Sequence, residues 1–218
     1  MNVLFDIDDT LFPSSEFSSL ARKNSINAMI GIGLDFPYDE LRARLDRIIS
    51  EKGSNYGRHF DDLLSEMGLS GGSRFIAAAI AAYHDTKASI QPFPRVPMTL
   101  LKLREGGHAL YVATRGNSIK QWDKLIRLRL ALFFGKVFVC ESEESKDEGF
   151  YRDIVSQLGC RPPDCVMVGD REDTDIAPAK AAGLRTVRIL AGKYASVPSE
   201  ADRSTSDFGA LTKILDDL

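Results

Sequence analysis

The chain has 218 residues, of which 44% are hydrophobic and 27% charged, as in a globular protein with a sizeable core, so disorder along its length is excluded. A formal net charge of -3 excludes a broad basic surface for nucleic acid or anionic lipid, and no apolar run approaches the roughly 20 residues of a membrane span. Three cysteines without a spaced framework, and an acidic N-terminal segment unlike a signal peptide, predict a cytoplasmic protein with reduced thiols.

Five short apolar segments rich in strand-forming residues follow one another along the chain, and helical patterns separate them. Strands that alternate with helices predict an α/β fold with a doubly wound parallel sheet and helices on both of its faces. The predicted strands are 3–5, 109–113, 137–140, 165–168 and 186–189, and the predicted helices are 96–105, 118–130, 149–158 and 174–182.

The stretch 13–92 breaks this alternation, because it contains helical patterns and no buried strand. Pro92 and Pro94 mark the return to the α/β pattern. We therefore predict a core domain formed by residues 1–12 and 93–218, with an all-helical domain of residues 13–92 inserted after the first strand. The predicted inserted helices are 16–32, 38–51, 60–67 and 75–87.

Acidic residues follow the first predicted strand. Asp6 and Asp8 are two residues apart, and such residues point to the same side of an extended chain. We therefore expect both carboxylates to face one site at the carboxyl end of the strand, where ligands bind in open α/β sheets. A solvated acidic turn is the simpler alternative, but core-type residues such as Leu4 and Ile7 interleave with these acids.

A second acidic pair, Asp170 and Asp175, follows the strand predicted at 165–168. Asp173 or Thr174 is expected to cap the next helix, which leaves Asp170 without a structural explanation. Acids at two strand ends favour a hard cation such as Mg²⁺, which prefers oxygen ligands.

Two further polar residues follow other predicted strands. Thr114 precedes Arg115 and the start of a helix, where a hydroxyl and backbone N–H groups form a natural phosphate cradle. Lys146 follows the strand predicted at 137–140. An isolated lysine in a charged loop is usually solvated, and only its place after a strand makes Lys146 a candidate.

Four segments together resemble the motifs of the haloacid dehalogenase (HAD) superfamily. Residues 5–11, Phe-Asp-Ile-Asp-Asp-Thr-Leu, resemble the first motif, and Thr114, Lys146 and the stretch 169–175 occur in the order of the other three. The resemblance implies a Rossmann-like core, and the helical insertion resembles the cap of subfamily I. More narrowly, the sequence resembles an archaeal branch that is often labelled glyceraldehyde 3-phosphate phosphatase. This resemblance is carried by the segments 21–24, 53–56, 83–87 and 116–122.

The resemblance implies a Mg²⁺-dependent phosphatase that forms an aspartyl-phosphate intermediate. Asp6 would be the nucleophile, and Asp8 the acid that protonates the leaving oxygen and the base that later activates water. Mg²⁺ would be held by Asp6, the carbonyl of Asp8 and Asp170, with Asp175 fixing the metal-binding loop. The implied substrate is a small phosphorylated metabolite, a sugar or triose phosphate.

The same resemblance implies that Thr114 and Lys146 hold the phosphoryl oxygens. Arg115 stands where the family usually has Asp or Asn, and it becomes a further candidate for phosphate binding. Asp147 stands where the family usually has Pro after the lysine.

Other functions remain open at this point. A phosphomutase or a nucleotidase would share this core, and a non-catalytic binding protein could retain it. A dehalogenase is disfavoured because it needs neither Asp8 as an acid nor the second acidic pair. In the helical insertion, Asn55, Arg58 and His84 are polar candidates for contact with the substrate, although each is more often a surface residue.

Overall fold

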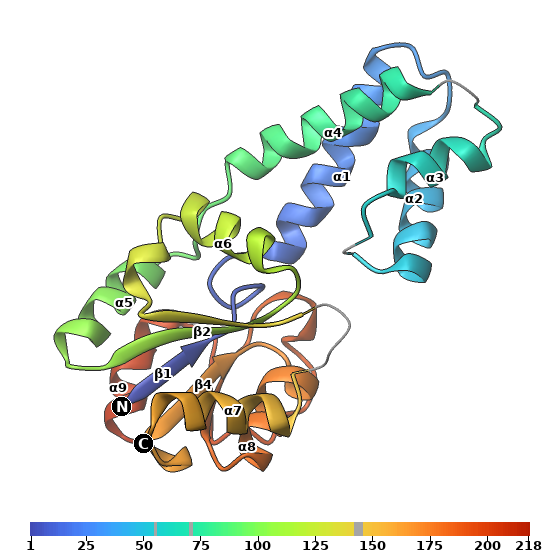
Figure 1. The fold of residues 1–218 in the computed structure, drawn as a ribbon. Helices are drawn as coiled ribbons and strands as arrows, with labels where there is room; N and C mark the ends of the chain where they lie inside the picture. Colours follow the sequence, from blue (N-terminus) through green and yellow to red (C-terminus); the bar gives the residue numbers. More distant parts are fainter. Residues whose placement is uncertain (55, 70–71, 142–145) are drawn as a thin grey trace. The chain divides into compact units, whose positions relative to one another are not determined.

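The computed structural model describes residues 1–54, 56–69, 72–141 and 146–218 (Figure 1). These residues form two compact units, one made of Met1–Ser15 with Gln91–Leu218 and the other of Glu16–Ile90. None of the described helices is both long and apolar enough to cross a membrane. The three cysteines are free thiols.

The first unit contains a sheet of six parallel strands in the order β3-β2-β1-β4-β5-β6. This arrangement confirms the predicted doubly wound α/β class. The strands are β1 (Asn2–Phe5), β2 (Ala109–Arg115), β3 (Lys136–Cys140), β4 (Cys165–Gly169), β5 (Arg185–Ile189) and β6 (Arg203–Thr205). The helices of this unit are α5 (Val96–Glu105), α6 (Ser118–Arg127), α7 (Glu148–Leu158), α8 (Ala177–Ala181) and α9 (Leu211–Asp216).

Both faces of the sheet are covered, which explains the continuous apolar strands. Leu4 packs into a cluster with residues of α7 and α8, including Tyr151. The next residue, Phe5, points the other way, and its ring centroid lies 6.1 Å from that of Phe134 and 6.0 Å from that of Phe208. Helices α5 and α9 belong to that opposite layer (Figure 1).

The direction of the strand order reverses at β1. The chain passes from β1 to β2 and β3 on one side and then places β4 on the other. Phe5 is level with Val112 of β2 and with Val168 of β4, so three carboxyl strand ends meet at one edge. Such a switch point is where open α/β sheets place their ligand sites.

The second unit consists of the helices α2, α3 and α4 and most of α1. These helices enclose their own apolar core, which contains Ile26, Leu45 and Phe75 among other residues. Ser25 adds a buried hydrogen bond from its hydroxyl to the carbonyl of Ala79, at 2.8 Å. The bounds are α1 (Ser14–Gly31), α2 (Tyr38–Lys52), α3 (His59–Glu66) and α4 (Ser73–Ala88).

The helix predicted at 174–182 is wrong in its first three residues. The segment Glu172–Ile176 forms a single π-helical turn, and α8 begins only at Ala177. Pro178 explains the break, because proline has no N–H to donate to the carbonyl of Thr174. The hydroxyl of Tyr151 donates to that carbonyl instead, at 2.9 Å. The π turn also has no side-chain cap, contrary to the predicted role of Asp173 or Thr174.

The predicted helix at 118–130 ends three residues early, at Arg127. Arg129 adopts a left-handed conformation with φ of 58°, and the N–H of Leu130 donates to the carbonyl of Leu125 at 2.9 Å. This is the usual way for a helix to close, but glycine normally occupies the left-handed position. Because arginine occupies this position instead of glycine, the sequence did not predict the end of the helix here.

Candidate active site

Three aspartates meet at the carboxyl edge of the sheet. Asp6 follows β1, Asp170 follows β4, and Asp175 lies in the π turn after β4. All three are buried, and one carboxylate oxygen of each lies within 4.8 Å of the others. The two acidic segments predicted at separate strand ends thus lie together.

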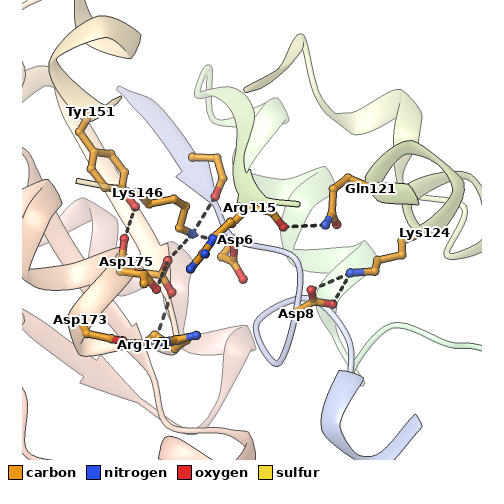
Figure 2. Close-up of polar contacts among 12 residues, drawn as sticks. Asp6, Asp8, Arg115, Gln121, Lys124, Lys146, Tyr151, Arg171, Asp173 and Asp175 are labelled. Atoms are coloured by element: carbon orange, nitrogen blue, oxygen red, sulfur yellow. Dashed lines mark hydrogen bonds and ion pairs between the residues drawn. The ribbon is translucent and has the colours of Figure 1, made fainter. Parts of the chain in front are cut away.

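Lys146 lies between Asp6 and Asp175 of this cluster (Figure 2). Its Nζ donates to Oδ1 of Asp6 at 2.8 Å and to the carbonyl of Ala113 at 3.2 Å, and it forms an ion pair with Asp175. Only 2% of its side chain is exposed. The lysine therefore joins the ends of β1 and β2 to the turn after β4, and it is far from the solvated residue that a charged loop usually contains.

The turn that carries Asp175 depends on Gly169. A Cβ at this position would lie 2.5 Å from Cβ of Asp175, closer than real contacts allow. Oδ2 of Asp175 accepts the backbone N–H of Arg171 at 3.1 Å, while Oδ1 faces Lys146. Both oxygens of Asp175 therefore have partners within the protein, which fixes the shape of the loop around Asp170.

Burial disfavours the charged form of these acids. It raises the pKa of Asp6 to about 6, against an opposing effect of Lys146, and the neighbouring Asp175 and Asp8 raise it further. Burial also raises the pKa of Asp170 to about 8, with added repulsion from Asp6 and Asp175. For Lys146, burial lowers the pKa, but the attraction of Asp175 and Asp6 is stronger and holds it well above its ordinary value.

The charges in this cluster do not balance. The three carboxylates and the ammonium group of Lys146 together carry a net charge of -2 when all four groups are ionised. Hard oxygen donors grouped in this way suit Mg²⁺, and a divalent cation would supply the missing charge. The raised pKa of Asp170 has a related cause, because in the absence of a cation a bound proton neutralises this carboxylate.

Asp8 lies apart from this cluster (Figure 2). Both of its carboxylate oxygens accept hydrogen bonds from Nζ of Lys124, on α6, at 2.7 and 2.6 Å. Its side chain is 40% exposed and that of Lys124 is 18% exposed. Sequence reasoning did not select Lys124, because a lysine on a helix carries no local sign of its partner.

Thr114 and Arg115 close β2 beside this edge. Thr114 is buried, whereas the side chain of Arg115 is exposed and points in Figure 2 toward the Asp6 side of the site. The carbonyl of Arg115 accepts the side-chain amide of Gln121 at 2.7 Å. Asn117 caps α6 by accepting the N–H of Lys120, at 3.2 Å. These bonds fix the connection between β2 and α6 that follows Thr114.

The chain matches a known protein family over most of its length. Residues 3–189 match the family described as haloacid dehalogenase-like hydrolase, and this span includes both acidic segments, Thr114 and Lys146. The chain belongs to this family. It is therefore a HAD hydrolase, as the motifs predict.

Known relatives cover almost the whole HAD chain. It is 44% identical to the glyceraldehyde 3-phosphate phosphatase of Methanopyrus kandleri, over 94% of this chain and 91% of the relative. It is 40% identical to the enzyme of the same name from Methanocaldococcus jannaschii, over 98% and 95% of the two chains. A HAD hydrolase of Bacillus subtilis bound to magnesium has the same fold, with a TM-score of 0.71 at 20% identity over 99% and 98% of the chains.

The unusual residue after the motif lysine of this HAD chain has a structural role. Asp147 is the N-cap of α7, and its carboxylate accepts the backbone N–H of Phe150 at 3.0 Å. Aspartate is among the preferred residues for this position. The departure from the usual proline therefore leaves α7 with a well-formed start next to Lys146.

Arg188 is a second charged residue of this HAD core that sequence reasoning missed. It is fully buried in β5, and its guanidinium donates to the backbone carbonyl of Asp170 at 3.0 Å. It also donates to the carbonyls of Tyr194, Val197 and Pro198, at 2.7, 2.8 and 3.1 Å. The acid after β4 is thus tied to the loop that follows β5.

Proposed function

We propose that this HAD hydrolase is a Mg²⁺-dependent phosphatase that hydrolyses a small phosphorylated metabolite, such as a triose phosphate, through a phosphoryl group carried on Asp6. The relatives named glyceraldehyde 3-phosphate phosphatase support a substrate of this size, because they match the chain almost from end to end. The acidic cluster around Lys146 supports the metal and the covalent step.

The observation that carries the proposal is the setting of Asp6. Its carboxylate is buried, it stands at the end of the central strand, and one of its oxygens is held by Lys146. The pairing orients the carboxylate, and burial removes much of the water that weakens a nucleophile. The other oxygen of Asp6 is the one available for attack on phosphorus.

The reaction then has two steps. An oxygen of Asp6 attacks phosphorus, the bond from phosphorus to the ester oxygen breaks, and Asp8 gives a proton to that oxygen. Asp8 next accepts a proton from a water molecule that attacks the same phosphorus. The bond from phosphorus to Asp6 breaks, and inorganic phosphate and free enzyme are formed.

Asp6, Asp170 and the carbonyl of Asp8 would hold Mg²⁺, with Asp175 positioning the loop. When bound, Mg²⁺ reduces the repulsion between an anionic nucleophile and a phosphate dianion. Lys146, in the segment between β3 and α7, would contribute a positive charge to the phosphoryl group. We infer that the hydroxyl of Thr114 and the exposed guanidinium of Arg115, the last two residues of β2, bind phosphoryl oxygens.

Residues 13–92 are the proposed cap, and we infer that this helical insertion selects the leaving group of the substrate. Arg58 and His84 are exposed there and can contact a ligand, while Asn55 lies outside the described residues. The α/β core needs only the phosphoryl group for catalysis. The choice among phosphate esters therefore falls to the insertion.

A substrate panel tests this function. The purified protein is assayed for phosphate release from glyceraldehyde 3-phosphate, other sugar phosphates, nucleoside monophosphates and a phosphopeptide, with Mg²⁺ or with EDTA. We expect small sugar or triose phosphates to exceed the phosphopeptide by at least ~100-fold in kcat/KM, about 2.7 kcal/mol of transition-state discrimination. Loss of activity in EDTA should be reversed by added Mg²⁺.

Other outcomes identify the alternatives. Conversion of one sugar phosphate into another without phosphate release would indicate a phosphomutase, and preference for nucleoside monophosphates would indicate a nucleotidase. Binding without turnover would indicate a non-catalytic protein. Mass spectrometry after an acid quench tests the intermediate directly, and the added phosphoryl group should lie on the peptide that contains Asp6.

A further inference from the structure

Lys124 reaches Asp8 from a firmly held helix. Leu125, the next residue of α6, is fully buried, and Gln121 on the same side of the helix is bonded to the end of β2 at 2.7 Å. The ammonium group of Lys124 lies within 2.7 Å of both carboxylate oxygens of Asp8. Two contacts from one donor restrict the rotation of the carboxylate.

The turn that carries Asp8 is ordered at its other end as well. Asp8 forms an isolated bridge with Phe12, and the N–H of Leu11 donates to the carbonyl of Ile7 at 2.9 Å. The ammonium of Lys124 lies 6.0 Å from the centroid of the Phe12 ring, within reach of a cation–π attraction. Lys124 therefore contacts both the carboxylate and the apolar side of this turn.

We propose that Lys124 is a positioning residue for the candidate active site, and that it orients the carboxylate of Asp8 for both proton transfers. This inference rests on the proposed function, because it assumes that Asp8 is the acid and base of a phosphatase. An exposed ion pair usually adds little to stability, but this pair joins a separate helix to the turn that directly follows the nucleophile.

The alternative is that Lys124 binds the phosphoryl group itself, as Lys146 is proposed to do. The two roles differ in how they depend on the leaving group. A sugar alkoxide needs a proton as it leaves, whereas p-nitrophenolate is a stable anion and leaves without one. Loss of Asp8 orientation would slow the first step only for the alkyl ester, but it would slow attack by water for both substrates.

The experiment compares wild type with Lys124→Met, Lys124→Arg and the control Arg127→Met. Arg127 is on the same helix and forms an exposed pair with Asp123 at 2.9 Å, so its loss removes an ion pair that does not include Asp8. Each protein is assayed in saturating Mg²⁺ with a triose or sugar phosphate and with p-nitrophenyl phosphate. The release of p-nitrophenolate is also followed before the steady state.

We expect kcat/KM of Lys124→Met for the alkyl phosphate to fall between about tenfold and about 100-fold, part of the roughly 10²–10⁴-fold effect of general acid–base catalysis. For p-nitrophenyl phosphate, kcat/KM should stay within about threefold while kcat falls at least about tenfold. A burst of about one equivalent of p-nitrophenolate should appear, because the phosphorylated enzyme accumulates. Lys124→Arg should recover most of the activity, since a guanidinium also pairs with a carboxylate.

Equal losses of kcat/KM for the two substrates would overturn the proposal and assign Lys124 to phosphate binding. Unchanged kinetics of Lys124→Met, or a comparable loss in Arg127→Met, would overturn it as well. A wild-type protein without phosphatase activity on any substrate of the panel would instead reject the proposed function itself. The two failures are therefore distinguishable.

Discussion

Two lysine–aspartate contacts in the same structural unit have very different surroundings. Lys146 is buried with Asp6 and Asp175, and 2%, 11% and 1% of the three side chains is exposed. Lys124 and Asp8 are 18% and 40% exposed, although both oxygens of Asp8 accept bonds from the lysine. The first contact lies in the interior at the sheet edge, and the second lies on the surface of a helix.

The difference in burial gives the two lysine–aspartate pairs different expected roles. In the interior, an uncompensated charge is costly, so Lys146 should matter for stability, metal binding and the ionisation of Asp6 and Asp170. At the surface, water screens the attraction, so Lys124 should matter for the orientation of Asp8 and little for stability. The two pairs should therefore respond differently to mutation and to pH.

The largest effect is expected from Asp6→Asn, which keeps the shape of this buried side chain but removes the proposed nucleophile. We expect kcat to fall at least about 10³-fold, since the covalent route is lost. Asp173→Asn is the control, because Asp173 is an exposed acid in the neighbouring loop that pairs with Arg171. Activity of Asp6→Asn within about tenfold of wild type would contradict the assignment, because ~1.4 kcal/mol is too small for covalent catalysis.

Lys146→Met, which removes the cation of the buried pair, should destabilise the folded protein. Removal of one partner of a buried pair typically costs about 3–5 kcal/mol, and we expect a loss of this size in the free energy of unfolding at pH 7.5 in EDTA. Urea unfolding followed by circular dichroism measures it. The loss should shrink at pH 5, where protons neutralise Asp6 and Asp170. An equal loss at both pH values would show that packing, and not charge, is responsible.

The metal-free protein should lose stability as the pH rises from about 5 to 8. The folded-state pKa values of Asp6 and Asp170, about 6 and about 8, lie above the ordinary value of 3.8. The folded state therefore binds more protons than the unfolded state, and the stability that these protons contribute disappears as the pH rises through the folded pKa values. The pKa of His108 is lowered by burial, which gives an opposite slope near neutrality.

Asp170→Asn separates these contributions, because His108 is unchanged in both proteins. The stability of wild type relative to Asp170→Asn should fall with pH by on the order of 1 kcal/mol per pH unit between pH 6 and 7.5, as one proton is lost. Urea unfolding in EDTA across this range measures the difference. A constant difference would show that Asp170 is already ionised, and excess Mg²⁺ should flatten the wild-type slope by replacing the proton.

The smallest effect is expected from Lys124→Met, on stability. Exposed ion pairs contribute about 0–1 kcal/mol, so the free energy of unfolding should change by no more than about 1 kcal/mol. Urea unfolding alongside Arg127→Met gives the comparison within one helix. A loss above about 2 kcal/mol would mean that the pair holds α6 against the core, and the contrast with Lys146 would disappear.

The local sequence pattern was sufficient to predict most of the fold. Apolar runs predicted β1 to β5 within two residues at each end, because a strand buried on both faces needs such residues at every position. The edge strand Arg203–Thr205 was missed, since its polar residues have no such requirement. The π turn before α8 was also missed, although Pro178 four residues after Thr174 was a usable sign.

The meeting of Asp6 and Asp170 at one place also follows from the sequence. Asp6 and Asp170 each follow a buried strand, and parallel strands of a doubly wound sheet end at the same edge. The cationic partner of each acid, in contrast, depends on the three-dimensional fold. Lys146 and Lys124 are 140 and 116 residues from Asp6 and Asp8, and a long side chain has no partner that local periodicity can reveal. Strand order, helix placement and burial selected those partners, and the different burial then gave two similar ion pairs different physical consequences.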